Sequence, residues 1–183
     1  SSGLVGAIVE ITGTSLLGGA TSASSVSLAG LSVEEVLSAN ATKVVVRAGN
    51  GTGGVSGDVV IVSDSGAVVT SLGAWTYTQA GVVSSVEPPF GQLNTIVTVT
   101  GTRLLGDGSN LVNITLSGVE ATVHSYNDSV IVVSASGSSN VGVGDVVITS
   151  ETGGRVVGFN DWEYREQGEI LQADPSSGNG GTS

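Results

Sequence analysis

Apolar and polar residues alternate along several short segments of this chain, and clusters of Gly, Ser, Asn and Asp separate the segments. In residues 95–101, Val97 and Val99 fall on one face while Thr98 and Thr100 fall on the other. This two-residue period is typical of a half-buried β-strand. Further segments that predict strands are residues 7–13, 112–118, 129–136, 144–150 and 158–166. Short strands at this spacing predict an all-β chain of β-sandwich architecture.

The strand pattern occurs twice because the sequence contains an internal repeat. Thr12-Gly13-Thr14 recurs 88 residues later, and the Trp-x-Tyr sequence at residues 75–77 recurs after 87 residues. The opening Ser-Ser-Gly also returns, at residues 176–178. A fixed period of this length indicates tandem domains built on one plan.

The repeat divides the chain into two domains and a tail. We predict a first domain at residues 1–80, a second at 81–168, and the leading strand of a further repeat at 169–183. Residues 82–89 supply the leading strand of the second domain, and the first domain has no such segment before it. The first domain is therefore predicted to lack its first strand.

Residues 31–38 have two interpretations. Ser32 and Glu35 have the spacing of a helix capping box. The corresponding segment of the second repeat, residues 119–125, alternates as a strand does. We predict strands at both places.

These motifs resemble the IPT/TIG family of immunoglobulin-like domains. In the second repeat the resemblance is carried by Pro-Pro-Phe-Gly at 88–91, Val-Thr-Val-Thr-Gly at 97–101, residues 118–123, and Trp-Glu-Tyr at 162–164. The first repeat keeps only the counterparts at residues 9–13 and 75–77, and it departs from the family at Gly30–Val33. The resemblance implies two tandem immunoglobulin-like sandwiches. Members of this family occur in cell-surface receptors, in transcription factors and in carbohydrate-active enzymes.

Composition and charge exclude several function classes. The chain has 16 acidic and 5 basic residues, a net charge of −11 and no cysteine. Binding to nucleic acid or to an anionic membrane needs clustered Lys and Arg, so neither partner is expected. Disulfides and thiol catalysis are excluded, and no apolar run reaches the roughly 20 residues of a membrane span. Without an initiator Met or a leader-like segment, the sequence is expected to be a mature or excised piece of a longer one.

Candidate catalytic and ligand-binding residues have simpler structural interpretations. His124 has no nucleophile pattern near it, and the G-x-G-x-x-G match at Gly49, Gly51 and Gly54 is followed by a strand instead of a helix. Residues 107–110 resemble a calcium loop only faintly, since the first repeat has no carboxylate there. Asp58 and Asp145 repeat, and we interpret them as turn-capping residues before strands. We expect no enzyme activity, no metal and no cofactor.

Four N-x-S/T sequences could carry covalent glycans. These N-glycosylation sequons begin at Asn40, Asn50, Asn113 and Asn127. Asn40 and Asn127 lie 87 residues apart at the same turn, yet the residues that follow them differ. Retention of a sequon by both copies favours glycosylation at these two, given a eukaryotic secretory route.

The ends of the chain suggest an assembly mechanism. The predicted donor strand consists of Glu169, Ile170, Leu171, Gln172, Ala173, Asp174 and Pro175. If the tail of one subunit fills the vacant edge of the next, head-to-tail strand addition builds an extracellular glycosylated filament or stalk from copies of this chain. If the chain is a window on a longer polypeptide, the same strand contact is intramolecular.

The alternative is a cell-surface adhesin or receptor ectodomain that binds a protein or a glycan. A lectin-like site needs exposed aromatic side chains, for which Phe90, Tyr126 and Phe159 are the candidates.

Overall fold

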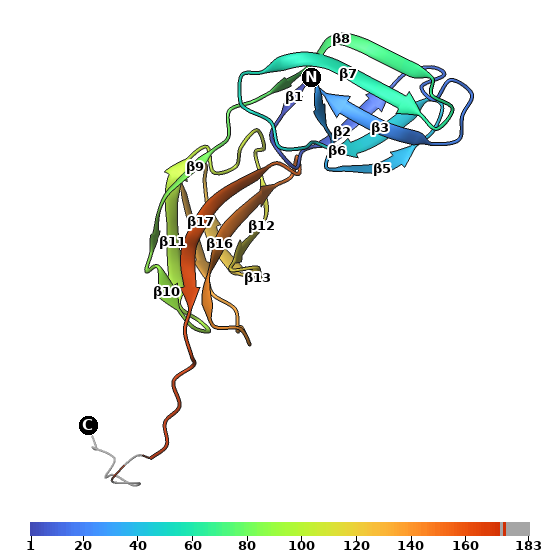
Figure 1. Cartoon of the computed structure of the whole chain (residues 1–183). Helices are drawn as coiled ribbons and strands as arrows, with labels where there is room; N and C mark the ends of the chain where they lie inside the picture. The colour runs from blue at the N-terminus through green and yellow to red at the C-terminus, as the bar shows by residue number, and fades with distance from the viewer. Residues whose placement is uncertain (173, 175–183) are drawn as a thin grey trace.

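The computed structural model describes residues 1–172 and residue 174, which form two β-sandwich domains joined by a short linker at residues 78–81 (Figure 1). The predicted all-β, immunoglobulin-like fold is confirmed. Domain 1 comprises β1 (Ser2–Gly3), β2 (Ile8–Thr12), β3 (Ala23–Leu28), β4 (Leu31–Ser32), β5 (Glu35–Ala39), β6 (Lys43–Arg47), β7 (Ser56–Ser63) and β8 (Val68–Tyr77). Domain 2 comprises β9 (Val82–Glu87), β10 (Phe90–Gly91), β11 (Ile96–Thr102), β12 (Leu111–Leu116), β13 (Val119–Glu120), β14 (Thr122–Tyr126), β15 (Val130–Ser134), β16 (Gly142–Ser150) and β17 (Arg155–Tyr164).

Each domain stacks two sheets, and the sheets follow one plan. Domain 1 has the strand orders β1-β8-β7-β3-β4 and β2-β6-β5, and domain 2 has β10-β17-β16-β12-β13 and β14-β15-β11-β9. Strand β9 pairs antiparallel with β11, and it has no counterpart in domain 1. Within the described residues, β2 is therefore an edge strand on the side where β11 is paired.

Two separate hydrophobic cores fill the sandwiches. Alternate residues of the facing strands point inward, as the sequence pattern requires. The repeated Trp-x-Tyr sequence supplies the largest side chains of each core. Trp75 meets Tyr77 edge to face with ring centroids 5.7 Å apart, and Trp162 meets Tyr164 in the same way at 5.5 Å. The cores confirm the alternation predicted for these strands.

The repeated Ser-Ser-Gly marks a short parallel strand. Ser2 and Gly3 pair with Thr76 and Tyr77 of β8, and Phe90 and Gly91 pair in the same register with β17. A Cβ on Gly3 would lie 2.9 Å from the Trp75 ring. Glycine is needed here because the backbone runs directly over the core tryptophan.

The ambiguous segment at residues 31–38 is extended. It forms β4 and β5, as residues 119–126 form β13 and β14. The strand prediction is confirmed at both places, since pairing with β3 and β6 outweighs the local capping-box signal.

The repeated aspartates fix a bulge in the middle of the hairpins, so their interpretation as turn caps was wrong. Asp58 and Asp145 lie inside β7 and β16. Their Oδ1 atoms accept hydrogen bonds from the backbone N–H groups of Gly73 (2.8 Å) and Asn160 (2.9 Å) on the opposite strand. Gly73 and Asn160 have φ values of 58° and 56°, a conformation that forms where extra residues bulge out of the ladder.

Of the leading strand predicted at residues 169–183, the structure describes residues 169–172 and 174, and these are not paired in a sheet of the described chain. Residues 165–172 leave domain 2 and run away from it without joining a sheet of the described chain (Figure 1). A strand needs a hydrogen-bonded neighbour, and no strand of the described residues lies beside the tail. The described part of the chain holds no helix that is long and apolar enough to cross a membrane.

The bulge gives a stability prediction. Asp145→Ala should lower the free energy of unfolding by about 1 kcal/mol, because the Asn160 N–H loses its acceptor. Asp145→Asn keeps an oxygen at this position and should cost less. Chemical denaturation measures both, with Glu120→Ala on the exposed edge as the control. An Asp145→Ala variant as stable as the Glu120→Ala variant would contradict the assignment.

Candidate assembly site

A groove of about 260 Å³ lies along the unpaired edge of β2. It opens onto the core of domain 1, because no strand of the described residues covers the inward side chains there. Its wall is formed mainly by Val9, Ile11, Leu16, Val59, Ile61, Val69, Ser71 and Trp75. We call this surface the groove.

Domain 2 shows what occupies the equivalent position. There β9 lies along β11 and places Val86 in the core, while Val83 packs against the core from the edge. A register shift between Thr100 and Gly101 turns both valines toward the core although they are three residues apart. The groove of domain 1 therefore has the shape left by an absent β9.

Exposure confirms this comparison. Val99 and Val156 of domain 2 are 0% and 2% exposed, whereas their counterparts Ile11 and Val69 in domain 1 are half-buried. Gly158 lies under β9, and a Cβ there would approach the Val83 Cβ to 3.1 Å. Its counterpart in domain 1 is Ser71, which is exposed in the groove.

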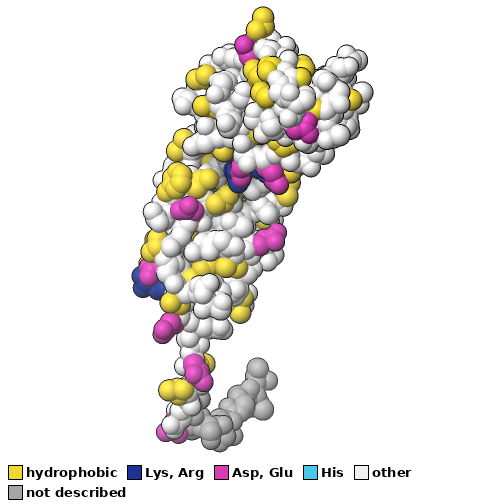
Figure 2. Space-filling model, turned by 45° about the vertical axis from the view of Figure 1, so that its right-hand side comes forward, with side chains coloured by type: hydrophobic (Ala, Val, Ile, Leu, Met, Phe, Trp, Pro, Cys, Tyr) yellow, Lys and Arg dark blue, Asp and Glu magenta, His cyan; other side chains and the backbone are white. Residues whose placement is uncertain are grey.

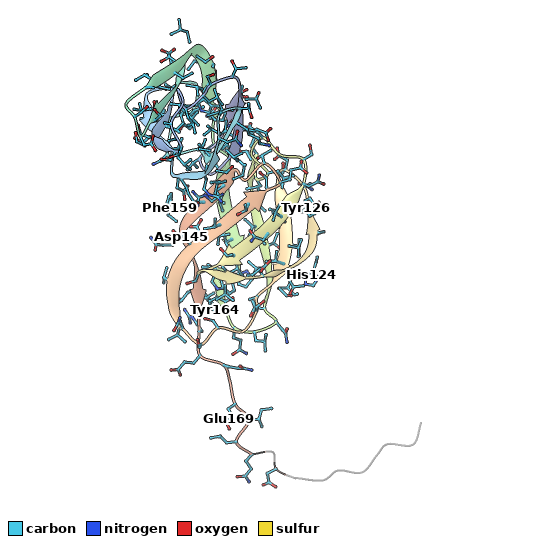
Figure 3. All side chains as sticks on the ribbon, turned by 90° about the vertical axis from the view of Figure 1, so that its right-hand side faces the viewer. His124, Tyr126, Asp145, Phe159, Tyr164 and Glu169 are labelled. Carbon is cyan, nitrogen blue, oxygen red and sulfur yellow. The ribbon has the colours of Figure 1, made fainter. Side chains whose placement is uncertain are left out.

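The tail carries apolar side chains that face solvent. Ile170 and Leu171 are 88% and 87% exposed, and Figure 2 shows apolar side chains on the tail beyond domain 2. Glu169 likewise stands clear of the domain in Figure 3. The Gly168 N–H donates to Gln92 Oε1 (2.9 Å), which holds the start of the tail against domain 2. Gln172 and Asp174 are also exposed, and Ala173 and Pro175 lie outside the described residues.

A tight junction connects the two domains. The Ile8 N–H donates to the Thr152 carbonyl (2.9 Å), and the Arg155 N–H donates to the Val5 carbonyl (3.0 Å). Leu4 is 2% exposed and lies against the backbone of Gly106 and Gly154. The two domains therefore meet through backbone pairing around one buried leucine.

Polar side chains also interact across this junction. Arg155 of domain 2 forms an ion pair with Glu34 of domain 1, and the Thr78 hydroxyl donates to the Asp107 carboxylate. Figure 2 shows basic and acidic side chains gathered where the domains meet. Asp107, a candidate calcium ligand in the sequence, thus serves as a hydrogen-bond acceptor for the linker. Among the described residues no group of three or more His, Cys, Asp or Glu side chains could hold a metal ion.

A second pair of repeated carboxylates stabilises the hairpin turns. Asp64 accepts hydrogen bonds from the hydroxyls of Thr21 and Ser22, and these bonds, Ser22 first, lower the pKa of Asp64. Glu151, its counterpart, accepts from the side chain of Asn110 and the N–H of Ser109, which lowers the pKa of Glu151. Each turn is thereby tied to the loop that precedes β3 or β12.

The sequons differ in exposure. Asn40, Asn50 and Asn127 are exposed, whereas Asn113 is half-buried within β12. Oδ1 of Asn40 accepts from the N–H groups of Thr42 and Lys43, and Oδ1 of Asn127 from those of Ser129 and Val130. The turn therefore engages the oxygen and not the nitrogen that would carry a sugar.

The remaining candidates are dispersed. His124 and Tyr126 lie on β14 at one side of domain 2, while Phe159 lies on the opposite side beside Asp145 (Figure 3). Phe159 is 74% exposed. Gly51 of the Gly-rich segment contacts the Tyr77 ring and is followed by β7. Phe159 therefore shares no site with His124 and Tyr126, and Phe90 lies under the Arg165 guanidinium, whose carbon is 4.0 Å from the Phe90 ring centroid.

Three solved structures are similar to this chain, each with a TM-score below 0.5. The extracellular region of plexin A4 is 21% identical over 95% of this chain and 16% of its own, with a TM-score of 0.48. The protein SGBP-B from a xyloglucan utilization locus of Bacteroides uniformis is 17% identical over 86% and 45% of the two chains, with a TM-score of 0.35. The γ-CGTase of the alkalophilic Bacillus clarkii is 18% identical over 88% and 21%, with a TM-score of 0.40. The chain spans less than half the length of each of these proteins.

Sequence comparison identifies the second domain. No curated protein sequence matches the chain, but residues 82–160 match the family model of the IPT/TIG domain. This match covers β9 to the beginning of the bulge in β17, and domain 1 repeats the same strand order without β9. The second domain belongs to the IPT/TIG domain family, and the first domain repeats its motifs.

Proposed function

We propose that this chain is a structural subunit of an extracellular filament or stalk, in which the tail of one copy completes domain 1 of the next. The groove beside β2 is the observation that carries the proposal, because it is the site that β9 fills in domain 2. The subunit is non-enzymatic in this proposal, and its partner is another copy of itself.

The repeat fixes the register of the donated strand. Counting 87 residues from β9, Ile170 takes the place of Val83 and Ala173 takes the place of Val86. Leu171 takes the exposed place of Ser84. Burying an isoleucine side chain contributes about 1.5–3 kcal/mol, and pairing along β2 adds backbone hydrogen bonds that an edge strand lacks.

Glycine spacing supports the same register. A Cβ on Gly81 would overlap the carbonyl oxygen of Arg103, so β9 can enter its sheet only with glycine at this position. Gly168 is the counterpart of Gly81, although no atom would lie within 4 Å of a Cβ there in the free chain. Arg103 and its counterpart Ser15 have φ values of 50° and 53°, so the receiving loop of domain 1 has the matching shape.

The geometry favours an acceptor domain that lies beyond domain 2. The tail leaves the end of domain 2 that lies away from domain 1 (Figure 1). The four linker residues 165–168 extend over at most about 14 Å, which directs the tail to a domain beyond its own. Each copy thus has a donor at one end and an acceptor at the other, which is the arrangement of an open, heterologous assembly.

The truncated chain tests the proposal. A chain without residues 169–183 should remain monomeric at concentrations where the full chain forms head-to-tail multimers, measured by light scattering and electron microscopy. Assembly should weaken at least about tenfold, since 1.4 kcal/mol corresponds to a factor of ten. Filaments that persist unchanged would refute strand donation.

A point variant provides the control for this truncation. Gly168→Ala should leave the unfolding curve of the free chain unchanged and weaken assembly, because the added Cβ would meet only the acceptor loop. The neighbouring exposed substitution Glu166→Ala should affect neither measurement.

Filling the groove tests the acceptor side. Ser71→Trp should block assembly, because the indole occupies the place into which Ile170 packs. Ser71→Gly restores the residue that domain 2 has under β9 and should assemble at least as well as the natural chain. Both variants should keep the melting temperature of the free subunit, because Ser71 is exposed. Normal assembly of a folded Ser71→Trp variant would show that the tail binds elsewhere.

Glycans would shield the domain boundaries of such a filament. The turn at Asn127 is bonded to the loop at residues 101–105, which leads into the junction. The turn at Asn40 is bonded in the same way to Gly13 and Leu16. Sugars at these two positions would stand beside successive boundaries, which supports glycosylation of Asn40 and Asn127 over that of the half-buried Asn113.

Mass spectrometry of the native material checks these sites. Enzymatic removal of N-glycans should lower the intact mass and convert Asn40 and Asn127 to aspartate, with lower occupancy at Asn113. Asn40→Gln and Asn127→Gln variants should each remove one glycan mass. Unmodified asparagine at both positions in material from a eukaryotic secretory route would refute the assignment.

One observation favours the adhesin or receptor alternative. The bulges held by Asp58 and Asp145 expose Leu72 (82%) and Phe159 (74%) at equivalent positions of the two domains. A pair of apolar side chains presented in this way suits a protein or glycan ligand. Binding of a defined partner by a chain that stays monomeric would favour this alternative over the filament.

A further inference from the structure

The internal junction between domains 1 and 2 suggests a second contact between successive copies, in addition to the donated strand. Domain 1 contributes residues 4–8 to this junction, and domain 2 contributes the β16–β17 turn at residues 151–155. By the repeat, domain 2 has the counterpart of the first segment at residues 92–96, and domain 1 has the counterpart of the second at residues 64–68. We call these two segments the free ends of domain 2 and domain 1.

We propose that the free end of domain 2 binds the free end of domain 1 of a second copy, as a variant of the internal junction. The proposal rests on the proposed head-to-tail assembly and names a second surface in it. The bond from Ile8 to Thr152 would be repeated by Ile96 N–H to the Ser65 carbonyl. The bond from Arg155 to Val5 would be repeated by Val68 N–H to the Leu93 carbonyl.

The backbone of both free ends has the conformation that the internal junction uses. Gly6 and Gly153, which face each other in the junction, have φ values of 82° each. Their counterparts Asn94 and Gly66 have φ values of 68° and 83°. The Asn94 N–H also donates to Ala135, as the Gly6 N–H does to Ala48. Both free ends are therefore already shaped for the contact before a partner arrives.

Exposed apolar side chains mark the same two surfaces. Val68 is 61% exposed, and on the free end of domain 2 Leu93 and Ile96 are 42% and 54% exposed. Val68 stands where the internal junction has Arg155, which pairs with Glu34. In the contact between copies, apolar side chains therefore take the place of the Arg155–Glu34 ion pair.

At the free ends, the counterparts of the buried Leu4 and of its neighbour Gly154 both differ from the residues of the internal junction. Gly154, which lies under Leu4, is replaced by Ala67, and Leu4 itself is replaced by Gln92. Gln92 already binds the Gly168 N–H at the base of the tail. Asn94 has a side chain where Gly6 has none, and a Cβ on Gly6 would lie 2.7 Å from the Gly153 carbonyl oxygen. The two free ends must therefore sit slightly further apart than the internal junction does.

A second copy fits this surface because the tail brings it there. A donated strand held by the four residues 165–168 places the acceptor domain directly beyond domain 2, as the linker 78–81 places domain 2 beyond domain 1. The effective concentration of the two free ends is then in the millimolar range, so that even a small apolar contact forms.

Disulfide trapping tests this contact, since the chain has no cysteine of its own. In the double variant Val68→Cys, Leu93→Cys the two thiols of one chain lie on different domains and far ends of the molecule. Paired residues of adjacent strands lie within the Cα range of a disulfide. Mild oxidation of the assembled protein should therefore give a ladder of covalent multimers. The yield of these multimers should be at least about tenfold above background, because the effective concentration of the two thiols is in the millimolar range.

Two matched variants calibrate the measurement. Val5→Cys, Arg155→Cys should close a disulfide within one chain at the internal junction. Leu72→Cys, Leu93→Cys places an equally accessible thiol away from the proposed contact and gives the background.

The outcomes separate the two proposals. Assembly with a ladder supports the end-to-end contact. Assembly without a ladder above background, while the internal pair closes, overturns this contact and leaves strand donation standing. Failure of the natural chain to assemble overturns the proposed function together with this inference.

Discussion

The unpaired edge of β2 combines two costs that a folded domain normally avoids. On the edge away from β6, no strand of the described residues pairs with its N–H and C=O groups, and the side chains beneath face solvent where a core should close. Domain 2 avoids both costs with six residues of β9, which pair with β11 and place Val86 over the core. Domain 1 can gain the same stabilisation only if a strand from outside the domain pairs with β2. This deficit gives the tail its role in the proposed assembly.

Local features of the tail and of domain 1 suit the proposed strand donation. The tail has glycine at position 168, although a Cβ there would have no atom within 4 Å in the free chain. In the acceptor loop, Ser15 has a positive φ. Ser71 instead of glycine lines the groove and gives it a polar residue while it is open. Gly168 and Ser15 thus match Gly81 and Arg103 of the second repeat, where the corresponding strand is paired.

Much of the fold could be predicted from the sequence. The alternation of Val97 and Val99 with threonines, the repeated Trp-x-Tyr and the recurring Ser-Ser-Gly are local signals, and each corresponds to a strand or a core residue of the structure. The roles of Asp145 and Glu34 were not predictable in this way. Asp145 acts on Asn160 across a hairpin, and Glu34 pairs with Arg155 121 residues away, so neither partner is visible in a local pattern. The groove residue Ser71 was detectable, because the repeat aligns it with Gly158, but only the packing of Val83 gives that difference a meaning.

Strand donation alone does not decide the form of the assembly. Two rods with a donor at one end and an acceptor at the other could also exchange tails side by side in a closed dimer. In that arrangement domain 1 of the partner would lie beside domain 2, and the free ends at residues 64–68 and 92–96 would stay apart. The short linker at 165–168 and the matched backbone of Asn94 and Gly66 favour the partner beyond domain 2. With every junction in that orientation, one fixed rotation relates successive copies, and a rotation that does not close produces a filament.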